Sequence, residues 1–317
     1  MTGPVLLAAL TATGVLLLAW QRRRVLRWAV ALRRRQAGRV VYHDGDGLPS
    51  PTGARQTILT RTTVIKLQAS RVAVIESEKT HRAAAIAADS EWFDVAAITG
   101  GDPAQGRIEF QRIDNAVPLW SWLVGRGATD SRVMAERVGQ ALAEIHQRLR
   151  IPLDVGESLG GPWRPEPGDV SGFSMNQDHE VALHGDFNAW NLLVTDEGAG
   201  LVIVDWAGSD LCSPWLVRGP WVFDAAWLIV TLFRSWLGPV ERIGQAEAFA
   251  ESFLAAYAKG RRLPEAPLVC RDYLRHLMPV WRRPEIRERR DQWLRPKLDV
   301  ERLATFAGVR GVVRDVA

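Results

Sequence analysis

The chain of 317 residues changes its character near Pro118, and this change limits the folds that it can adopt. Before Pro118, short runs rich in β-branched and apolar residues are separated by Gly- and Pro-rich breaks, a pattern that predicts strands. One stretch with helical character, residues 70–89, interrupts these runs. The predicted strands are RVVYH (39–43), RQTILT (55–60), TTVIKL (62–67), FDVAAI (93–98) and GRIEFQRI (106–113).

The residues after Pro118 predict mainly helices, because residues 131–149 repeat apolar side chains with the 3.6-residue period of a helix. Further helix candidates are residues 223–237, 245–259 and 267–280. The polar segment 151–180 is interpreted as a long connection. The order predicts an α+β chain of two lobes, residues 39–118 and 119–317, with a cleft between them where ligands commonly bind.

The N-terminus predicts a membrane anchor. Residues 4–20 contain no charged side chain, and a bilayer-spanning helix needs roughly 17–25 residues. Seven arginines follow between residues 22 and 35, and by the positive-inside rule they lie on the cytoplasmic side. A cleaved signal peptide is disfavoured because the charges follow the apolar run, and a buried soluble helix because of the arginines. We therefore expect residues 1–38 to form a single-pass anchor with a basic amphipathic helix over 21–36, and the remainder to be cytoplasmic.

The positive net charge of +4 is local to this N-terminal segment. Without the eight arginines of the first 39 residues, 32 basic residues remain against 36 acidic ones. This balance argues against nucleic-acid binding by the main domain. The two cysteines, Cys212 and Cys270, can form neither a disulfide framework nor a zinc site.

The chemically informative stretch is VALHGDFNAWNLLV (181–194), followed by GLVIVDWAGSD (200–210). Asp186 and Asn191 are five residues apart, and Asp205 ends an apolar strand. Phosphoryl transfer needs a carboxylate that accepts the proton of the nucleophile and oxygen ligands that hold Mg²⁺ against the phosphates. We therefore predict Asp186 as the catalytic base and Asn191 and Asp205 as ligands of nucleotide-bound Mg²⁺.

The pattern H-G-D-x-x-x-x-N, followed by a strand that ends in I-V-D-W, resembles the aminoglycoside phosphotransferase and choline kinase family. The resemblance implies a protein-kinase-like fold, with a small antiparallel N-lobe and a mainly helical C-lobe, and the use of ATP (or another NTP) with Mg²⁺. It places His184 beside Asp186 among the catalytic candidates, although a structural hydrogen-bonding role is the favoured interpretation of His184. Asp224 is expected to brace the catalytic-loop backbone, and His146 to pack in the interior.

The same resemblance places a phosphate-contacting lysine at Lys66, near the end of a predicted strand. Its carboxylate partner is expected on the helix over residues 70–89, where Glu78 is favoured and Glu76 stays open. The loop that covers the phosphates is expected near residues 44–54, and the linker 113–119 beside the adenine. No G-x-x-x-x-G-K-[ST] motif is present, which argues against a Walker-type NTPase.

The leading interpretation is a kinase that phosphorylates a hydroxyl of a small molecule or of a membrane-associated glycan. An antibiotic-modifying phosphotransferase and a catalytically silent pseudokinase scaffold at the membrane are the alternatives. Trp190 and Asn188 occupy catalytic-loop positions where the aminoglycoside enzymes usually have other residues. We expect Trp190 either to narrow the substrate side or to pack under the loop.

Overall fold

The structure is a computed structural model of the whole chain, and it describes the greater part of the sequence after residue 55. The described residues are 40–41, 56–123, 126–166, 168–170, 180–195, 198–233, 241–283 and 300–308. None of the helices in these ranges is long and apolar enough to cross a bilayer. The predicted anchor at 4–20, the basic stretch at 21–36 and the predicted phosphate-covering loop at 44–54 lie outside the described residues.

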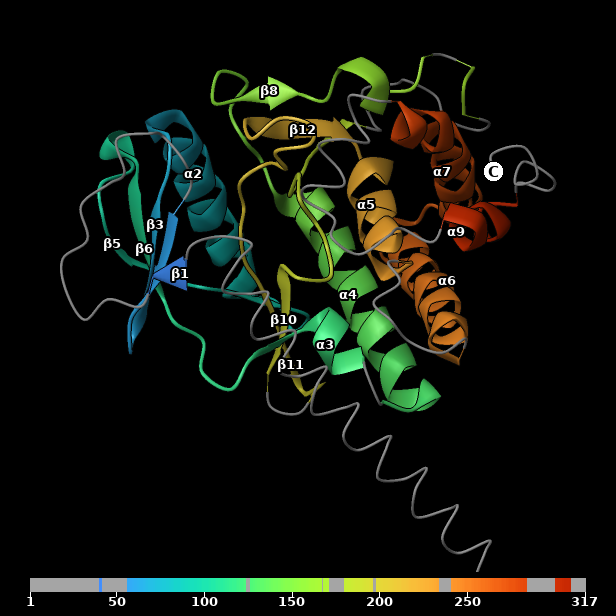
Figure 1. Cartoon of the computed structure of the whole chain (residues 1–317), viewed down its shortest axis with the longest axis horizontal. Coiled ribbons are helices and arrows are strands. Elements are labelled where there is room, and N and C mark those ends of the chain that lie inside the picture. Colours follow the sequence, from blue (N-terminus) through green and yellow to red (C-terminus); the bar gives the residue numbers. More distant parts are fainter. Residues whose placement is uncertain are drawn as a thin grey trace, which may run out of the picture.

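A five-stranded sheet with one helix against it forms the N-terminal part of the structure (Figure 1). The strand order is β1-β2-β3-β6-β5. The pairs β2–β3, β3–β6 and β5–β6 are antiparallel. The elements are β1 (Val40–Val41), β2 (Gln56–Leu59), β3 (Thr63–Leu67), α2 (Ser70–Ala87), β5 (Ile98–Gly100), η1 (Pro103–Gln105) and β6 (Arg107–Gln111). The expectation of a wholly antiparallel sheet is wrong at its edge, because β1 pairs with β2 in parallel.

The predicted strand over residues 93–98 divides into two strands that serve different sheets. Its beginning, β4 (Asp94–Val95), pairs in parallel with β11 (Gly200–Ile203) in a four-stranded sheet that also contains β10 (Leu192–Thr195) and β7 (Val117–Pro118). The following strand β5 instead pairs with β6 in the N-terminal sheet. The segment therefore links the two parts of the structure, which a continuous run of β-forming residues does not reveal.

The C-terminal part is mainly helical, as predicted, and includes two small sheets. Its elements are β7 (Val117–Pro118), α3 (Leu119–Leu123), α4 (Ala128–Arg148), β8 (Glu157–Ser158), η2 (Gly161–Trp163), β9 (Glu180–Ala182), β10 (Leu192–Thr195), β11, β12 (Leu216–Pro220), α5 (Val222–Leu232), α6 (Glu241–Arg261), α7 (Ala266–Arg282) and α9 (Val300–Phe306). Figure 1 shows α4, α5, α6 and α7 gathered on the side of the molecule away from α2.

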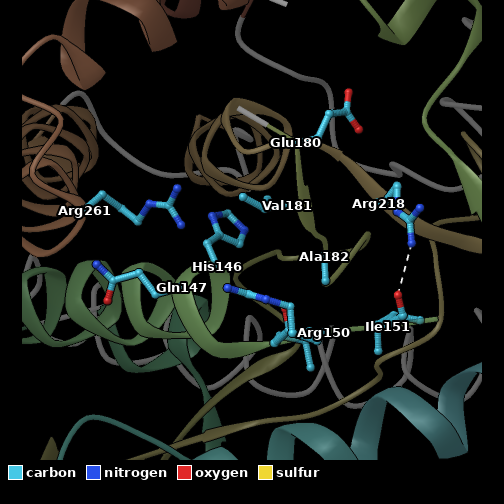
Figure 2. A pocket seen from close by; sticks show the side chains of 10 residues that line it. His146, Gln147, Arg150, Ile151, Glu180, Val181, Ala182, Arg218 and Arg261 are labelled. Atoms are coloured by element: carbon cyan, nitrogen blue, oxygen red, sulfur yellow. Dashed lines mark hydrogen bonds between the residues drawn. The ribbon is translucent and has the colours of Figure 1, made fainter. Parts of the chain in front are cut away.

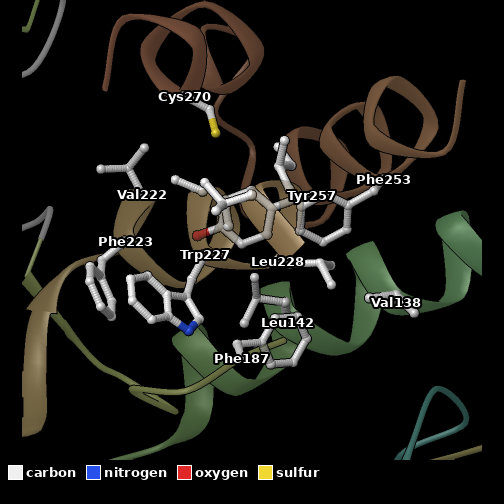
Figure 3. Packing of buried hydrophobic residues seen from close by; sticks show 14 of the residues in the cluster. Val138, Leu142, Phe187, Val222, Phe223, Trp227, Leu228, Phe253, Tyr257 and Cys270 are labelled. Atoms are coloured by element: carbon white, nitrogen blue, oxygen red, sulfur yellow. The ribbon is translucent and has the colours of Figure 1, made fainter. Parts of the chain in front are cut away.

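Helix α5 is the centre of this part, because every residue from Val222 to Leu232 is buried. The apolar stretch at 225–233 is thus a core helix, as its length predicted. Helices α4 and α6 approach closely at Gly139, where an added Cβ would lie 2.5 Å from the carbonyl oxygen of Phe253. Figure 3 shows side chains of α4, α5 and α6 packed together with Phe187 of the catalytic loop. The catalytic loop is therefore anchored to the apolar core through Phe187.

Candidate active site

The hairpin of β10 and β11 brings two of the predicted ligands together. In its antiparallel register Leu192 pairs with Ile203, so the residue before β10 and the residues after β11 emerge at the same end. The amide of Val204 donates to the carbonyl of Asn191 at 3.0 Å, which extends this pairing by one step. Asp205 follows with φ of 62°, a left-handed conformation that Asp and Asn tolerate better than most residues. Asn191 and Asp205 are therefore adjacent at the cleft end of one hairpin.

The carboxylate of Asp186 is held by two hydrogen bonds. Its Oδ1 accepts from the indole Nε1 of Trp227 at 2.9 Å, and its Oδ2 accepts from Nδ2 of Asn191 at 3.0 Å. Burial raises the pKa of Asp186 to about 6, and the negative charge of Asp205 acts in the same direction. Asp186 is thus a stronger proton acceptor than an exposed aspartate, and its oxygens are oriented before any substrate binds.

Asn188 shapes the turn between Asp186 and Asn191. Its Oδ1 accepts from the amides of Trp190 at 2.8 Å and of Asn191 at 3.2 Å, and its Nδ2 donates to the carbonyl of Asp186 at 3.1 Å. Such side-chain bonds to nearby backbone are the usual way in which Asn stabilises a turn. The indole of Trp190 stacks on Trp120, with ring centroids 6.3 Å apart and planes 7° apart. Trp120 belongs to α3, so Trp190 packs against that helix, and its expected effect on the substrate side stays a prediction.

Asp224 braces the catalytic-loop backbone, as predicted. Its Oδ2 accepts from the amide of His184 at 2.7 Å, and its Oδ1 from the amide of Gly185 at 2.9 Å. The ring of His146 also contacts Oδ2, through Nε2 at 3.2 Å, and so does more than pack. Burial alone would raise the pKa of Asp224, but the hydrogen bonds from His146 and the loop bring it below its ordinary value. Gly185 is required here because its φ of 83° is left-handed.

His184 is a buried structural residue. Its Nδ1 lies 3.2 Å from the amide nitrogen of Asp186, and its Nε2 lies 3.2 Å from the carbonyl oxygen of Val204. Because the amide can only donate and the carbonyl only accept, the ring is the Nε2–H tautomer. Burial and the nearby ammonium of Lys79 lower its pKa to about 4, so the ring is neutral at physiological pH. Both ring nitrogens are occupied, which favours the structural interpretation over catalysis.

Lys66 joins the N-terminal sheet to the cleft. Its Nζ lies 2.5 Å from Oε1 of Glu76 and 2.8 Å from Oδ1 of Asp205. Burial disfavours the ammonium, but these two carboxylates together raise the pKa of Lys66 above its ordinary value. Lys66 therefore stays charged and faces the cleft, where it could neutralise phosphate oxygens.

The favoured partner of Lys66 was wrong, and the alternative, Glu76, takes its place. Glu78 lies on the exposed side of α2, where it pairs with Arg82 at 2.5 Å. Residues two apart on a helix point about 200° from each other, so only one of the two glutamates can face the cleft. Glu76 is fully buried, and its second oxygen accepts from Nε2 of Gln68 at 2.6 Å.

Sequence analysis missed a second lysine of the site, Lys79 in α2. The fully buried Lys79 donates from Nζ to the carbonyl of His184 at 2.6 Å and to that of Leu216 at 3.2 Å. Burial lowers its pKa to about 8, although nearby carboxylates oppose this effect. The available signal was its position three residues after Glu76, which places both side chains on the same face of the helix.

Comparison with known proteins agrees with this geometry. Residues 165–265 match the model of the phosphotransferase enzyme family, APH. The matched stretch contains Asp186, Asn191, Asp205 and Asp224. The chain is a kinase-like phosphotransferase. The resemblance and the enzyme class inferred from the sequence are thereby confirmed, and the chemistry of the family is the transfer of a phosphoryl group to a hydroxyl acceptor.

Three solved structures are similar to this phosphotransferase at low sequence identity. The streptomycin–ATP ternary complex of APH(2")-IIa has a TM-score of 0.50 and 10% identity, over 86% of this chain and 97% of the other. A choline/ethanolamine kinase family protein from Mesorhizobium loti has a TM-score of 0.41 and 15% identity, over 84% and 93%. A glucosamine kinase with glucosamine, ADP and phosphate has a TM-score of 0.46 and 16% identity, over 80% and 77%. No curated protein sequence matches the chain significantly.

The donor set of the phosphotransferase fits a magnesium ion that is shared with nucleotide. In the described part of the chain, no three His, Cys, Asp or Glu residues cluster as a protein-only metal site. Mg²⁺ in nucleotide sites commonly takes one or two protein carboxylates and completes its shell with phosphates and water. One carboxylate, from Asp205, beside the amide oxygen of Asn191 is a set of this kind.

Proposed function

We propose that this phosphotransferase moves the terminal phosphoryl group of ATP (or another NTP) to a hydroxyl of a small molecule or of a membrane-associated glycan. The observation that carries the proposal is the fixed carboxylate of Asp186. Burial and the charge of nearby Asp205 raise its pKa towards neutrality, and Lys66 forms an ion pair with the same Asp205. In this scheme residues 39–118 cover the nucleotide, and residues 119–317 supply the catalytic loop.

Asp186 would orient the acceptor hydroxyl and take its proton. As the hydroxyl oxygen forms its bond to the terminal phosphorus, the bond from that phosphorus to the bridging oxygen breaks, and the nucleoside diphosphate leaves. The hydrogen bonds from Trp227 and Asn191 fix both carboxylate oxygens, so little reorganisation is needed during the step. A general base of this kind typically contributes a rate factor of about 10² to 10⁴.

Asp205 and Asn191 would hold Mg²⁺, which when bound neutralises phosphate charge and aligns the terminal phosphate. Lys66 would contact the phosphates that approach the end of β3, and Glu76 keeps its ammonium aimed at the cleft. The amide group of Asn191 donates to Asp186 through Nδ2, which leaves its oxygen to act as the ligand. The same side chain would thus connect the base to the residues that hold the metal.

The apolar segment 4–20 and its arginines support a substrate at the inner face of a membrane. Such an anchor confines the catalytic domain to within a short distance of the lipid surface, which favours a lipid-linked sugar or another membrane-associated glycan as acceptor. A freely soluble antibiotic would gain nothing from this confinement. A silent scaffold would not need Asp186, Asn191 and Asp205 together.

Labelled ATP, Mg²⁺ and a panel of acceptors test the proposal. The panel contains hexosamines, choline, an aminoglycoside and lipid-linked glycans in vesicles. We expect transfer to a hydroxyl of a glycan acceptor, and a loss of about 10² to 10⁴ in turnover for Asp186→Asn with nucleotide affinity retained. Asp205→Ala should weaken Mg²⁺–nucleotide binding as well. The exposed Asp154→Asn is the matched control. Wild-type turnover in Asp186→Asn would refute the base.

Truncation tests the anchor separately from the chemistry. The full chain should remain with membranes through salt and carbonate washes, because apolar insertion is insensitive to salt. A chain that begins at residue 39 should be soluble and should still transfer phosphate to a water-soluble acceptor, since Lys66 and every later site residue are retained. Full-length protein in the soluble fraction of a detergent-free lysate would count against the anchor without affecting the phosphotransferase assignment.

A further inference from the structure

A hollow of about 520 Å³ lies behind the catalytic loop, outside the proposed nucleotide site. It is bounded by the end of α4, by β9 and β12, and by the end of α6 (Figure 2). Neither Lys66 nor Asp186, Asn191 or Asp205 is among the residues that line it. Its volume lies within the range of about 300–1,000 Å³ that is typical of small-molecule sites.

Three arginines from three separate elements line this hollow: Arg150 directly after α4, Arg218 in β12 and Arg261 at the end of α6. A guanidinium has five N–H donors. Two hydrogen bonds within the described part of the chain involve these side chains, from Arg150 Nη1 to the carbonyl of Leu149 (2.8 Å) and from Arg218 Nη2 to that of Ile151 (3.1 Å). The other donors of these two arginines have no partner among the described residues.

The positive charge of the hollow is not balanced within the part of the chain that the structure describes. The one carboxylate in its lining, Glu180, already pairs with Arg164 at 2.6 Å. No described Asp or Glu forms an ion pair with Arg150, Arg218 or Arg261. Moreover, Nε of Arg261 is buried without a hydrogen-bond partner among the described residues. A buried donor of a charged group without a partner is costly, which favours an acceptor brought by a ligand.

Apart from the arginines and the paired Glu180, the residues that line the hollow carry no charge at neutral pH, so the arginines determine which ligands it can attract. His146 lines it, but Nδ1 of this ring lies 2.8 Å from the hydroxyl of Tyr257 and Nε2 faces Asp224. Burial lowers the pKa of His146, and the charge of Arg261 acts in the same direction, so the ring adds no positive charge at neutral pH. The remaining lining residues shown in Figure 2, such as Val181 and Ala182, are apolar or uncharged.

We propose that this hollow binds an organic anion that carries a phosphate group. The planar guanidinium matches two phosphate oxygens at once, and a tetrahedral phosphate can present oxygens to more than one arginine. The volume exceeds what a bare phosphate ion needs, so the ligand carries an organic part beside the apolar wall. A soluble phosphate monoester and the headgroup of a phospholipid share this chemistry. The proposal does not depend on the proposed substrate or on the roles of the cleft residues.

Calorimetric titration of the full chain in neutral detergent tests this site. The probes are glycerol 3-phosphate, glycerol as its uncharged counterpart, and short-chain phosphatidic acid. We expect one or both phosphate probes to bind and glycerol to show no heat. Binding of glycerol 3-phosphate alone assigns a soluble monoester, and binding of phosphatidic acid alone assigns a lipid headgroup. Either result supports the site when the variants respond as follows.

Arg261→Gln and Arg218→Gln should each weaken the phosphate probe at least tenfold. The matched control is Arg262→Gln, because Arg262 is the next residue and is exposed. Lys66→Gln should leave this affinity unchanged, and thermal melting confirms that each variant folds. The proposal is overturned if neither phosphate probe binds. It is equally overturned if Arg261→Gln binds like wild type, or if Lys66→Gln abolishes binding that Arg261→Gln retains.

Discussion

Titration of the Lys79 ammonium makes the free energy of unfolding depend on pH, and this dependence can be measured separately from that of other groups. Its Nζ is fully buried against the carbonyls of His184 and Leu216, and burial lowers its pKa from the ordinary 10.5 to about 8. Between these two pH values the unfolded chain holds a proton that the folded chain has lost. Stability therefore rises with pH across this window, and the buried charge disfavours folding most strongly below pH 8.

The size of the effect follows from the same two values. At pH 7 the lowered pKa of Lys79 costs about 3 kcal/mol of folding free energy, and at pH 9.5 it costs about 1 kcal/mol. Lys79→Met removes this cost but leaves two buried carbonyls without their donor, at about 1–3 kcal/mol each. These terms nearly cancel at pH 7, so the absolute stability of the variant is uninformative. The change with pH is the informative quantity.

Urea denaturation of both proteins from pH 7 to pH 9.5 measures this change. We expect wild type to gain about 2 kcal/mol relative to Lys79→Met over that range. Other titrating groups are common to both chains and cancel in the difference. The exposed Lys259→Met is the matched control and should run parallel to wild type. If the curves of Lys79→Met and wild type are also parallel, Lys79 does not titrate in this window and the reasoning fails.

Further variants test the remaining contacts of the site. Asp224→Asn should lower the free energy of unfolding by about 2–4 kcal/mol, because the asparagine amide offers one acceptor oxygen where the loop amides now use both carboxylate oxygens. An unchanged thermal unfolding curve would contradict the bracing role of Asp224. Trp227→Phe should lower turnover about tenfold with the nucleotide KM unchanged, since it removes a bond that orients the base; a KM effect alone would contradict this role. Glu76→Gln should raise the nucleotide KM, whereas the exposed Glu78→Gln should match wild type in the same steady-state assay.

The parts of the site that sequence analysis predicted are those fixed by local spacing. Asp186 and Asn191 belong to one turn, and Asp205 ends the strand that pairs with β10, so their proximity follows from the chain order and the hairpin register. Lys66 was predicted instead from the family resemblance, which places a phosphate-contacting lysine near the end of this strand. The elements themselves were found largely where periodicity placed them, as α2 and α4 show.

The parts that were missed depend on which side of an element faces the core. The choice between Glu76 and Glu78 required the rotation of α2, which packing against the sheet determines and which a weak apolar period does not reveal. Lys79 was missed because its partners are backbone carbonyls more than 100 residues away. In the sequence, Trp227 cannot be told from any other aromatic residue of a buried helix. Its indole nitrogen reaches Asp186 only because α5 packs against the catalytic loop.

The residue after Asp205 restricts how an inhibitor could act on this protein. Trp206 is only 1% exposed, its Nε1 donates to the carbonyl of Ile203 at 3.2 Å, and its ring lies 4.7 Å from that of His184. In protein kinases a phenylalanine at this position sets the active or inactive arrangement. Extracting a fully packed indole would forfeit about 3–5 kcal/mol, judged from the cost of deleting large aromatic side chains. A compound that displaces this side chain would bind more weakly by that free energy. Inhibitor screening should therefore target the conformation in which the indole of Trp206 stays buried.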